Sequence, residues 1–190
     1  SAFELFVPAH ANRRIIFVCD HASTALPDAY GTLGLEHGQF ATHIAFDIGA
    51  AYVTRALATA YGARAVLARW SRLLIDLNRG ADDPTLVMKL SDGHIIPGNR
   101  DAGAQEIAHR LSTYFAPYHD AIAKEIAMVR ELNVVPTIIS IHSFTPVWQG
   151  FKRPWDVGVL WDKDGRLAKP LMAALARAGY TVGDNEPYRG

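Results

Sequence analysis

The stretch VVPTIISIH, residues 134–142, decides the fold that we predict for this chain. Its apolar residues predict a buried central strand, which follows a long helical pattern over residues 102–133. His142 comes directly after the strand, and the hydroxyl residues Ser143 and Thr145 follow it. Open α/β sheets bind ligands at the carboxyl ends of their strands. A histidine is also common in surface loops, so the rest of the sequence must decide between these interpretations.

Apolar strand-like runs alternate with helical patterns on both sides of this stretch. We expect strands at residues 15–19, 63–68, 72–76, 134–142 and 156–162, and helices at 41–62, 102–133 and 165–180. Pro117 is expected to kink or split the long helix, and Pro170 to lie in the first turn of the last one. The alternation predicts an α/β fold, a three-layer sandwich with a mainly parallel or mixed central sheet. We interpret residues 1–190 as a single domain.

The composition excludes several classes of protein. The chain has 190 residues, 49% hydrophobic and 20% charged, with 19 basic and 19 acidic side chains, so we expect no nucleic-acid partner. No apolar run is long enough to span a membrane. The single cysteine, Cys19, leaves no internal disulfide and favours a reducing, cytoplasmic compartment.

Polar side chains gather where three of the predicted strands end. The first strand ends in Cys19-Asp20-His21, the third in DLNR at residues 76–79, and the fourth in IHSF at residues 141–144. The carboxyl ends of parallel strands meet at one edge of a sheet. We therefore expect these groups to lie close together.

Two of these groups carry histidines that suit a metal. Catalytic zinc takes two or three nitrogen or oxygen ligands and keeps one open position for water. His21 and His142 supply two ligands, and Asp47 is the best candidate for the third, because a carboxylate within IAFDIGAA is costly unless paired, coordinated or facing solvent. His43 and Asp20 are rival ligands. The competing interpretations are structural histidines and a solvent-facing Asp47.

The segment SRLLIDLNR offers groups that bind carboxylates. Arginine grips a carboxylate with a planar fork, and Arg72 and Arg79 flank this segment together with Asn78. Next to a metal, these residues predict a clamp for an acidic substrate. The alternative is a set of structural ion pairs with Asp76 or Asp82.

A second loop and one nucleophile complete the candidates. The glycine- and proline-rich segment 91–103 reads either as a lid or substrate loop, with Asn99 as its binding residue, or as a plain connection. A nucleophilic pair of Cys19 and His142 is conceivable, but a core cysteine is the stronger interpretation.

Six motifs taken together resemble the N-formylglutamate amidohydrolase family in order and spacing, from about residue 15 to the end. They are VCDHAS, HIAFDIGA, SRLLIDLNR, IPGN, SIHSFTP and DNEPYRG. That family is similar in fold to the zinc carboxypeptidases (a phosphorylase/hydrolase-like fold) and to the succinylglutamate desuccinylase and aspartoacylase group. The resemblance implies a zinc ion at the sheet edge, with His21 and His142 as ligands and Asn78-Arg79 holding the substrate carboxylate, assisted by Arg72.

The chain departs from the carboxypeptidase pattern in two places. Those enzymes carry a glutamate three residues after the first histidine, where this chain has Thr24, so Asp47 as third ligand is our inference. Their general base is a glutamate on a late strand. Glu186 is the nearby candidate for the general base in this chain. The alternatives are a base in a missing C-terminal segment beyond Gly190, or no base at all.

The resemblance implies a zinc-dependent hydrolase that cleaves N-formyl-L-glutamate to formate and glutamate, in the amino-acid catabolism of histidine degradation. Other divalent metals fit the same ligands. The predicted partner is a small acidic molecule, and the sequence leaves the oligomeric state open. Two alternatives remain, a related zinc peptidase or deacylase with another substrate, and a non-catalytic metal- or ligand-binding domain.

Overall fold

The computed structural model describes residues 1–188, apart from the side chains of residues 12 and 13. The chain divides into two compact units, residues 1–144 and 145–190, and each is described by itself. The first unit holds a four-stranded sheet and both helices that cover it. The second holds a smaller βαβ arrangement and a hairpin.

The sheet of the first unit is mixed, as the sequence predicts. It consists of β1 (Phe3–Phe6), β2 (Asn12–Cys19), β3 (Ala63–Ala68) and β6 (Thr137–Ser140), in the order β1-β3-β2-β6. β2 runs parallel to β3 and β6, while β1 pairs with β3 in the antiparallel direction. The carboxyl ends of β2 and β6 therefore lie side by side.

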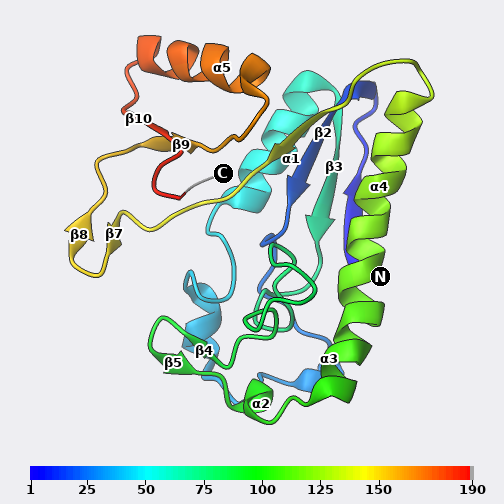
Figure 1. Ribbon diagram of the computed structural model, residues 1–190. Coiled ribbons are helices and arrows are strands. Elements are labelled where there is room, and N and C mark those ends of the chain that lie inside the picture. Colours follow the sequence, from blue (N-terminus) through cyan, green and yellow to red (C-terminus); the bar gives the residue numbers. More distant parts are fainter. Residues whose placement is uncertain (189–190) are drawn as a thin grey trace. The chain divides into compact units, whose positions relative to one another are not determined.

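One helix covers each face of this sheet, which confirms the layered α/β architecture (Figure 1). Helix α4 (Ala116–Arg130) packs on the face that carries Ile16 and Val18 of β2. Helix α1 (Ala50–Tyr61) packs on the other face, against Phe17 and Cys19. Side chains alternate between the two faces of a strand, so β2 is apolar on both sides and buried.

The helix expected at residues 41–62 begins only at Ala50, and the prediction was wrong for its first part. The backbone N–H of Asp47 donates to the carbonyl of His21 instead of to a residue one turn earlier. Gly49 then takes a left-handed conformation, with φ 81°, that redirects the chain into α1. Asp47 consequently lies in a turn rather than on a helix.

The buried face of α1 consists of small side chains. Ala50, Thr54 and Ala58 face the sheet, whereas Ile48 and Val53 are exposed. Small side chains at a spacing of four residues let the helix approach the sheet closely. The face of α1 that packs on the sheet is therefore determined by the size of its side chains and not by their hydrophobicity alone.

The strand predicted at residues 72–76 is absent, because this segment is a series of turns. Its residues are nevertheless buried: Leu74 and Ile75 pack beneath α4, and Leu73 packs in a separate cluster with Ile96. β3 already has a partner on each side, so no edge beside it is open to this run. The strand prediction was wrong because a short apolar segment that is buried on all sides has the same sequence pattern as a central β-strand.

The long helical pattern is interrupted just before Pro117, as expected. Helix α3 (Ala104–Arg110) passes through a π-helical turn, Leu111–Phe115, into α4. Proline lacks the N–H that an α-helix needs, and Ala116 instead donates to Leu111, five residues earlier. Short elements of the loops are η1 (Asp28–Tyr30), η2 (His37–Ala41), β4 (Leu90–Ser91), β5 (His94–Ile95) and α2 (Pro97–Arg100).

The second unit contains two parallel strands joined by a helix. The strands are β9 (Val157–Val159) and β10 (Val182–Asp184), and the helix is α5 (Gly165–Arg177). A hairpin of β7 (Val147–Trp148) and β8 (Phe151–Lys152) precedes them. Pro170 lies inside α5 and not in its first turn, where we had placed it. Its position is exposed, so water is available to the carbonyl that loses its helical partner.

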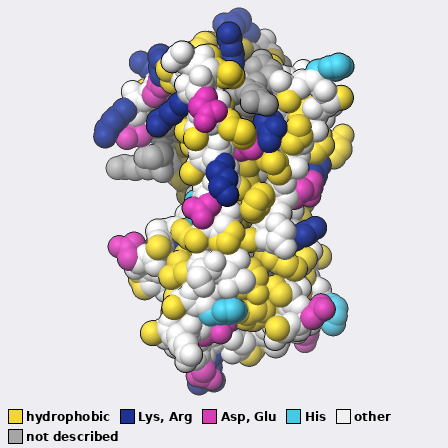
Figure 2. All heavy atoms as spheres, turned by 90° about the vertical axis from the view of Figure 1, so that its right-hand side faces the viewer, with side chains coloured by type: hydrophobic (Ala, Val, Ile, Leu, Met, Phe, Trp, Pro, Cys, Tyr) yellow, Lys and Arg dark blue, Asp and Glu magenta, His cyan; other side chains and the backbone are white. Residues whose placement is uncertain are grey.

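Charged side chains of both signs are scattered over the face that Figure 2 shows, in line with the balanced composition. Hydrophobic side chains occupy much of the area between them. In the described part of the chain, none of the helices combines the length and the apolar character that a membrane span requires.

Candidate metal centre

Two histidines meet at the carboxyl edge of the sheet. His21 follows the end of β2 by two residues, and His142 follows the end of β6 by two residues. The N–H of Ile141 donates to the carbonyl of Val18 at 2.9 Å, which continues the pairing of the two strands up to the site. The rings of His21 and His142 lie with their centroids 5.1 Å apart, edge to face.

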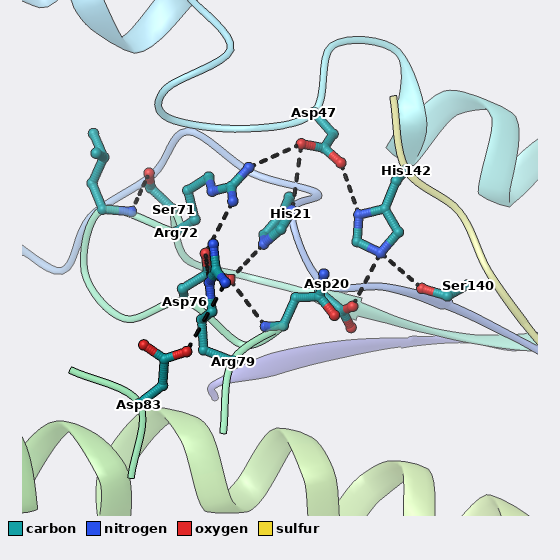
Figure 3. Close-up of polar contacts among 12 residues, drawn as sticks. Asp20, His21, Asp47, Ser71, Arg72, Asp76, Arg79, Asp83, Ser140 and His142 are labelled. Carbon is teal, nitrogen blue, oxygen red and sulfur yellow. Dashed lines mark hydrogen bonds and ion pairs between the residues drawn. The ribbon is translucent and has the colours of Figure 1, made fainter. Parts of the chain in front are cut away.

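Asp47 lies between the two imidazole rings (Figure 3). Its Oδ2 is 2.9 Å from Nδ1 of His142, and its Oδ1 is 3.4 Å from Nδ1 of His21. The backbone N–H of Ser143 also donates to Oδ2, at 3.2 Å. The structure thus brings together the three residues that we predicted as metal ligands, with one ligand atom of each within 4.8 Å of the others.

A second carboxylate holds the far side of each ring. Nε2 of His21 is 2.7 Å from Oδ1 of Asp76, and Nε2 of His142 is 3.3 Å from Oδ2 of Asp20. Each histidine therefore faces Asp47 through Nδ1 and an outer carboxylate through Nε2. Outer carboxylates of this kind orient histidine ligands in metal sites.

The ion pairs at the site shift the pKa values of its members. Burial alone would raise the pKa of Asp47, but His142 and His21 hold that pKa well below its usual value. Burial would lower the pKa of His142, but the carboxylates of Asp20 and Asp47 raise it to about 9. The pKa of His21 is also raised, against burial, by Asp47 and Asp76.

These residues fit a divalent cation on two grounds. Nδ1 of His21 is buried and makes no hydrogen bond, and its ion-pair partner, Oδ1 of Asp47, is 3.4 Å away, so a ring nitrogen without a hydrogen bond faces the triad. Asp20, Asp47 and Asp76 contribute three carboxylates, and among the described residues Arg72 is the one guanidinium that is hydrogen-bonded to them, while Arg79 lies 3.9 Å from Asp76. If both imidazoles are neutral, the three carboxylates and the guanidinium of Arg72 have a net charge of −2. A divalent cation would balance that charge. Two nitrogens and a carboxylate suit zinc and its neighbours in the first transition row.

The two arginines of SRLLIDLNR differ in how firmly they are held. The guanidinium of Arg72 donates to Asp76 at 3.0 Å and to Asp47 at 3.4 Å, and its side chain is 22% exposed. Arg79 is 47% exposed and makes only long ion pairs, 3.9 Å to Asp76 and 4.0 Å to Asp83. Arg79 is therefore the more exposed and the less firmly held of the two cations.

Asn78 and Asn99, the two predicted amide contacts, lie in different environments. Asn78 is exposed beside Arg79, and its backbone N–H donates to Asp76. Asn99 is fully buried, and both of its amide hydrogens go to backbone carbonyls, those of Leu73 and Met88. The substrate contact predicted for Asn99 stays a prediction that these contacts do not support.

Two other candidates are not members of the triad. His43, a rival ligand in our prediction, points to the exposed Asp92, with Nε2 3.1 Å from Oδ2. Cys19 is buried, and burial raises the pKa of its thiol to about 12, so the thiolate that nucleophilic attack needs does not form near neutral pH. Cys19 is a core residue, as we expected.

Glu186, the predicted general base, belongs to the second unit. It contributes to the lining of a hollow of about 310 Å³ together with Trp148 and Trp155. Its role as the general base stays a prediction.

The sequence prediction missed Asp76 as a member of the site. We treated this residue only as an ion-pair partner for the arginines, yet it is fully buried and contacts His21 directly. The argument that singled out Asp47, a carboxylate set among apolar residues, applies equally to the run LLIDL. Tyr118 was also missed, and its hydroxyl donates to Asp20 at 2.5 Å.

Comparisons with known proteins identify the family of the chain and its fold. The sequence profile of the N-formylglutamate amidohydrolase family matches residues 13–190. The crystal structure of gene product Atu2144 from Agrobacterium tumefaciens superposes with a TM-score of 0.94 at 37% identity, covering 99% of this chain and 74% of that one. No curated protein matches the chain.

A second solved structure shares the fold at lower identity. The N-formylglutamate amidohydrolase from Ralstonia eutropha JMP134 superposes with a TM-score of 0.71 at 23% identity, over 99% of this chain and 77% of that one. The profile match, which spans nearly the whole chain, decides the classification. The chain belongs to the N-formylglutamate amidohydrolase family.

Proposed function

We propose that this amidohydrolase is metal-dependent and cleaves the formyl amide of N-formyl-L-glutamate, giving formate and glutamate. His21, Asp47 and His142 would hold the metal, with zinc as the first choice and other divalent ions as alternatives. When bound, such an ion lowers the pKa of a coordinated water to about 7 and polarises a carbonyl oxygen. The observation that carries the proposal is the buried Nδ1 of His21, which faces Asp47 and His142 without a hydrogen bond.

The residues of the loop after Asp76 support an acidic substrate. Arg79 is half exposed, and its two carboxylate neighbours are 3.9 and 4.0 Å away, so an incoming carboxylate can replace them with short bidentate bonds. Asn78 lies exposed beside it as a further donor. Arg72, which already bridges Asp47 and Asp76, is better placed to hold those carboxylates together than to bind substrate.

Hydrolysis requires a group that moves one proton. The water oxygen bonds to the formyl carbon, the carbon–nitrogen bond breaks, and the proton taken from water goes to the departing amino group. We assign that transfer to a carboxylate, with Glu186 as the candidate that the sequence offers. Holding the substrate by Arg79 would place its formyl carbon for attack, and good placement lowers such barriers by several kcal/mol.

The proposal is tested by formate release from N-formyl-L-glutamate. The matched control substrate is N-formyl-L-glutamine, which has almost the same size but lacks the side-chain carboxylate. We expect turnover of the glutamate compound, a much lower kcat/KM for the glutamine compound, loss of activity with a chelator, and recovery with Zn²⁺.

Each contrary result has a definite meaning. Equal turnover of the two formyl compounds would refute the acidic specificity, and turnover of N-acetyl-L-glutamate alone would point to a related deacylase. Full activity in a chelated protein without detectable metal would refute metal dependence. Bound metal without turnover of any N-acyl amino acid would indicate a binding domain.

We also propose a cytoplasmic location. The support is the lone cysteine, Cys19, which is buried and reduced in the structure and forms no disulfide. Fractionation of cells that express the protein would test this proposal.

A further inference from the structure

Leu73 and Leu74 lie in the buried turns that replace the strand we expected at residues 72–76. A backbone carbonyl that is buried without a strand partner needs another hydrogen-bond donor. Nδ2 of Asn99 donates to the carbonyl of Leu73 at 2.7 Å, and Nη1 of Arg110 donates to the carbonyl of Leu74 at 2.8 Å. Two side chains from a later part of the chain therefore take the place of a neighbouring strand.

Arg110, the last residue of α3, is held by several contacts at once. It is 2% exposed, its Nη1 also donates to Oδ1 of Asn99 at 2.7 Å, and its Nε donates to Oε1 of Glu106 at 2.7 Å. Its Cζ lies 4.6 Å from the centre of the Tyr30 ring. The hydroxyl of Tyr30 donates to the same oxygen of Glu106 at 2.9 Å. A planar guanidinium can serve several acceptors in a fixed geometry, so these contacts define its position.

Arg110 also sets the orientation of the Asn99 amide. Oδ1 of Asn99 accepts from Arg110, so Nδ2 points to the opposite side. There it donates to the carbonyls of Leu73 and Met88, at 2.7 and 2.8 Å. Asn99 is fully buried, so no solvent competes for these bonds. The amide thereby joins the segment around Leu73 to the one around Met88.

The turn that carries Arg79 is bonded to this buried segment. The N–H of Asp76 donates to the carbonyl of Leu86 at 2.8 Å, and the N–H of Arg79 donates to the carbonyl of Asp76 at 3.2 Å. The N–H of Asn78 donates to the carboxylate of Asp76 at 3.0 Å. Residues 73–77 are buried, whereas the side chain of Arg79 is 47% exposed. A shift of the buried part would therefore move the exposed guanidinium with it.

We propose that Arg110 is a positioning residue. Through Leu74 and Asn99, it holds the turn that carries Arg79 in the place where Arg79 binds the substrate carboxylate. The inference rests on the proposed function, because it takes Arg79 as the substrate contact. Arg110 touches neither metal nor substrate in this role. Its replacement should therefore weaken substrate binding and leave the metal centre occupied.

The test compares Arg110→Lys with the matched control Arg64→Lys. Arg64 is 16% exposed and pairs through two nitrogens with Glu125, at 2.6 and 2.9 Å, but it lies at the amino end of β3. The single nitrogen of a lysine cannot serve all three acceptors of Arg110. We expect both variants to unfold at lower urea concentration than the parent.

Substrate binding should separate the two variants. We expect KM for N-formyl-L-glutamate to rise about 10-fold in Arg110→Lys, with kcat and the zinc content close to those of the parent. Arg64→Lys should keep the KM of the parent. An unchanged KM in Arg110→Lys, or an equal rise in Arg64→Lys, would overturn the proposal.

A double variant shows whether Arg110 acts through Arg79. Once the guanidinium of Arg79 is removed, its placement no longer matters. Adding Arg110→Lys to Arg79→Ala should therefore change KM by less than about 2-fold. A further rise as large as the one that Arg110→Lys causes in the parent would overturn the proposal.

Hydrogen exchange in the unaltered protein remains decisive if Arg110→Lys does not fold. The N–H groups of Leu74 and Asp83 make backbone hydrogen bonds of similar length, 2.9 and 3.0 Å, but Leu74 is fully buried and Asp83 is 29% exposed. If Asn99 and Arg110 hold the segment, the N–H groups of Leu74 and Asp76 should exchange at least about 100-fold more slowly than that of Asp83. Equal exchange rates would overturn the proposal.

The parent protein separates this inference from the proposed function. If the parent releases formate from N-formyl-L-glutamate and Arg110→Lys keeps the same KM, only the positioning role of Arg110 fails. If the parent releases no formate, the proposed function fails, and this inference fails with it.

Discussion

His21 and His142 contact the two oxygens of the same carboxylate, but their surroundings differ. His21 is almost fully buried, and its outer partner Asp76 is inaccessible to solvent. His142 is 31% exposed, and both of its ring nitrogens face carboxylates, Asp47 on one side and Asp20 on the other. The first histidine is therefore a fixed part of the folded unit, whereas the second completes the site from its exposed side.

The difference shows which histidine the fold already holds in a fixed orientation in the metal-free protein. On the His21 side, a network of buried bonds through Asp76 and Arg72 orients the ligand. On the His142 side, the ring pairs with carboxylates that a metal would partly replace. Binding there must exchange a proton for the cation, since metal ligands bind through the deprotonated form.

The largest expected effect is the difference in unfolding free energy between the two histidine-to-alanine variants of the metal-free protein. His21→Ala leaves a cavity where an almost fully buried ring stood and removes its 2.7 Å contact with Asp76, so the free energy of unfolding should fall by roughly 3–5 kcal/mol. His142→Ala should cost about 1 kcal/mol, because Asp20 keeps Tyr118 and Asp47 keeps Ser143 and Arg72. Urea unfolding of chelator-treated proteins measures both values. Equal losses in the two variants would contradict the difference.

A second prediction concerns Arg79, the proposed contact of the substrate carboxylate. Arg79→Ala should leave metal content unchanged and raise KM for N-formyl-L-glutamate about 10–100-fold, the effect of losing a charge-assisted bond worth roughly 1.5–3 kcal/mol. Steady-state kinetics and metal analysis of the same preparation give both quantities. The control is Arg166→Ala, which removes an exposed arginine paired only with Asp164 among the partners described for it. A fall in kcat at constant KM would show that Arg79 does not act in ground-state binding.

The pH dependence of stability reports on His142. Its pKa is raised to about 9, so the folded state binds this proton more tightly than the unfolded chain does. The resulting stabilisation is complete below the ordinary pKa near 6.5 and is lost as pH rises through 9. Between these limits the metal-free protein should lose about 1–2 kcal/mol of unfolding free energy, less than the full pKa difference implies because the ring is partly exposed.

His142→Gln provides the comparison for this titration, since other groups also change protonation above pH 8. The parent and the variant are unfolded with urea at pH 6, 7.5 and 9, and the difference in unfolding free energy is followed. We expect that difference to shrink as pH rises. A difference that grows with pH would contradict the assigned direction.

The smallest expected effect is that of Ser140→Ala. The hydroxyl of Ser140 shares Nε2 of His142 with Asp20, so the ring keeps a charged partner when the hydroxyl is removed. Zinc affinity should change by no more than a few-fold, or under about 1 kcal/mol. Dye competition at pH 7.5 measures it. A loss of about 10-fold or more would mean that the hydroxyl of Ser140 holds the ring as firmly as an outer carboxylate does.

Three of the four strands of the sheet and the triad could be predicted because their signals are local. Apolar runs indicated the positions of β2, β3 and β6. Residues that directly follow two neighbouring parallel strands must lie together at the carboxyl edge of the sheet. His21 and His142 follow from this rule. Asp47 was chosen for its apolar surroundings, and it reaches the site even though it lies in a turn and not on the expected helix.

The errors concern features that depend on tertiary contacts. Nothing in RLLID distinguishes a strand from a buried turn segment, because the difference lies in which sheet edges are already occupied. Asn99 is polar and flanked by glycine and proline, yet its amide serves the backbone of two buried loops. The role of Asp76 depends on its contact with a histidine 55 positions earlier in the chain.

Metal stoichiometry tests the central claim most directly. The parent, His21→Ala, Asp47→Ala, His142→Ala and the control His94→Ala, whose histidine is exposed in the β5 hairpin, are purified without chelator. They are incubated with Zn²⁺, desalted and analysed by plasma mass spectrometry. We expect about one zinc per chain in the parent and in His94→Ala, and none in the three triad variants. Absence of zinc from the parent, or its retention in any triad variant, would contradict the account.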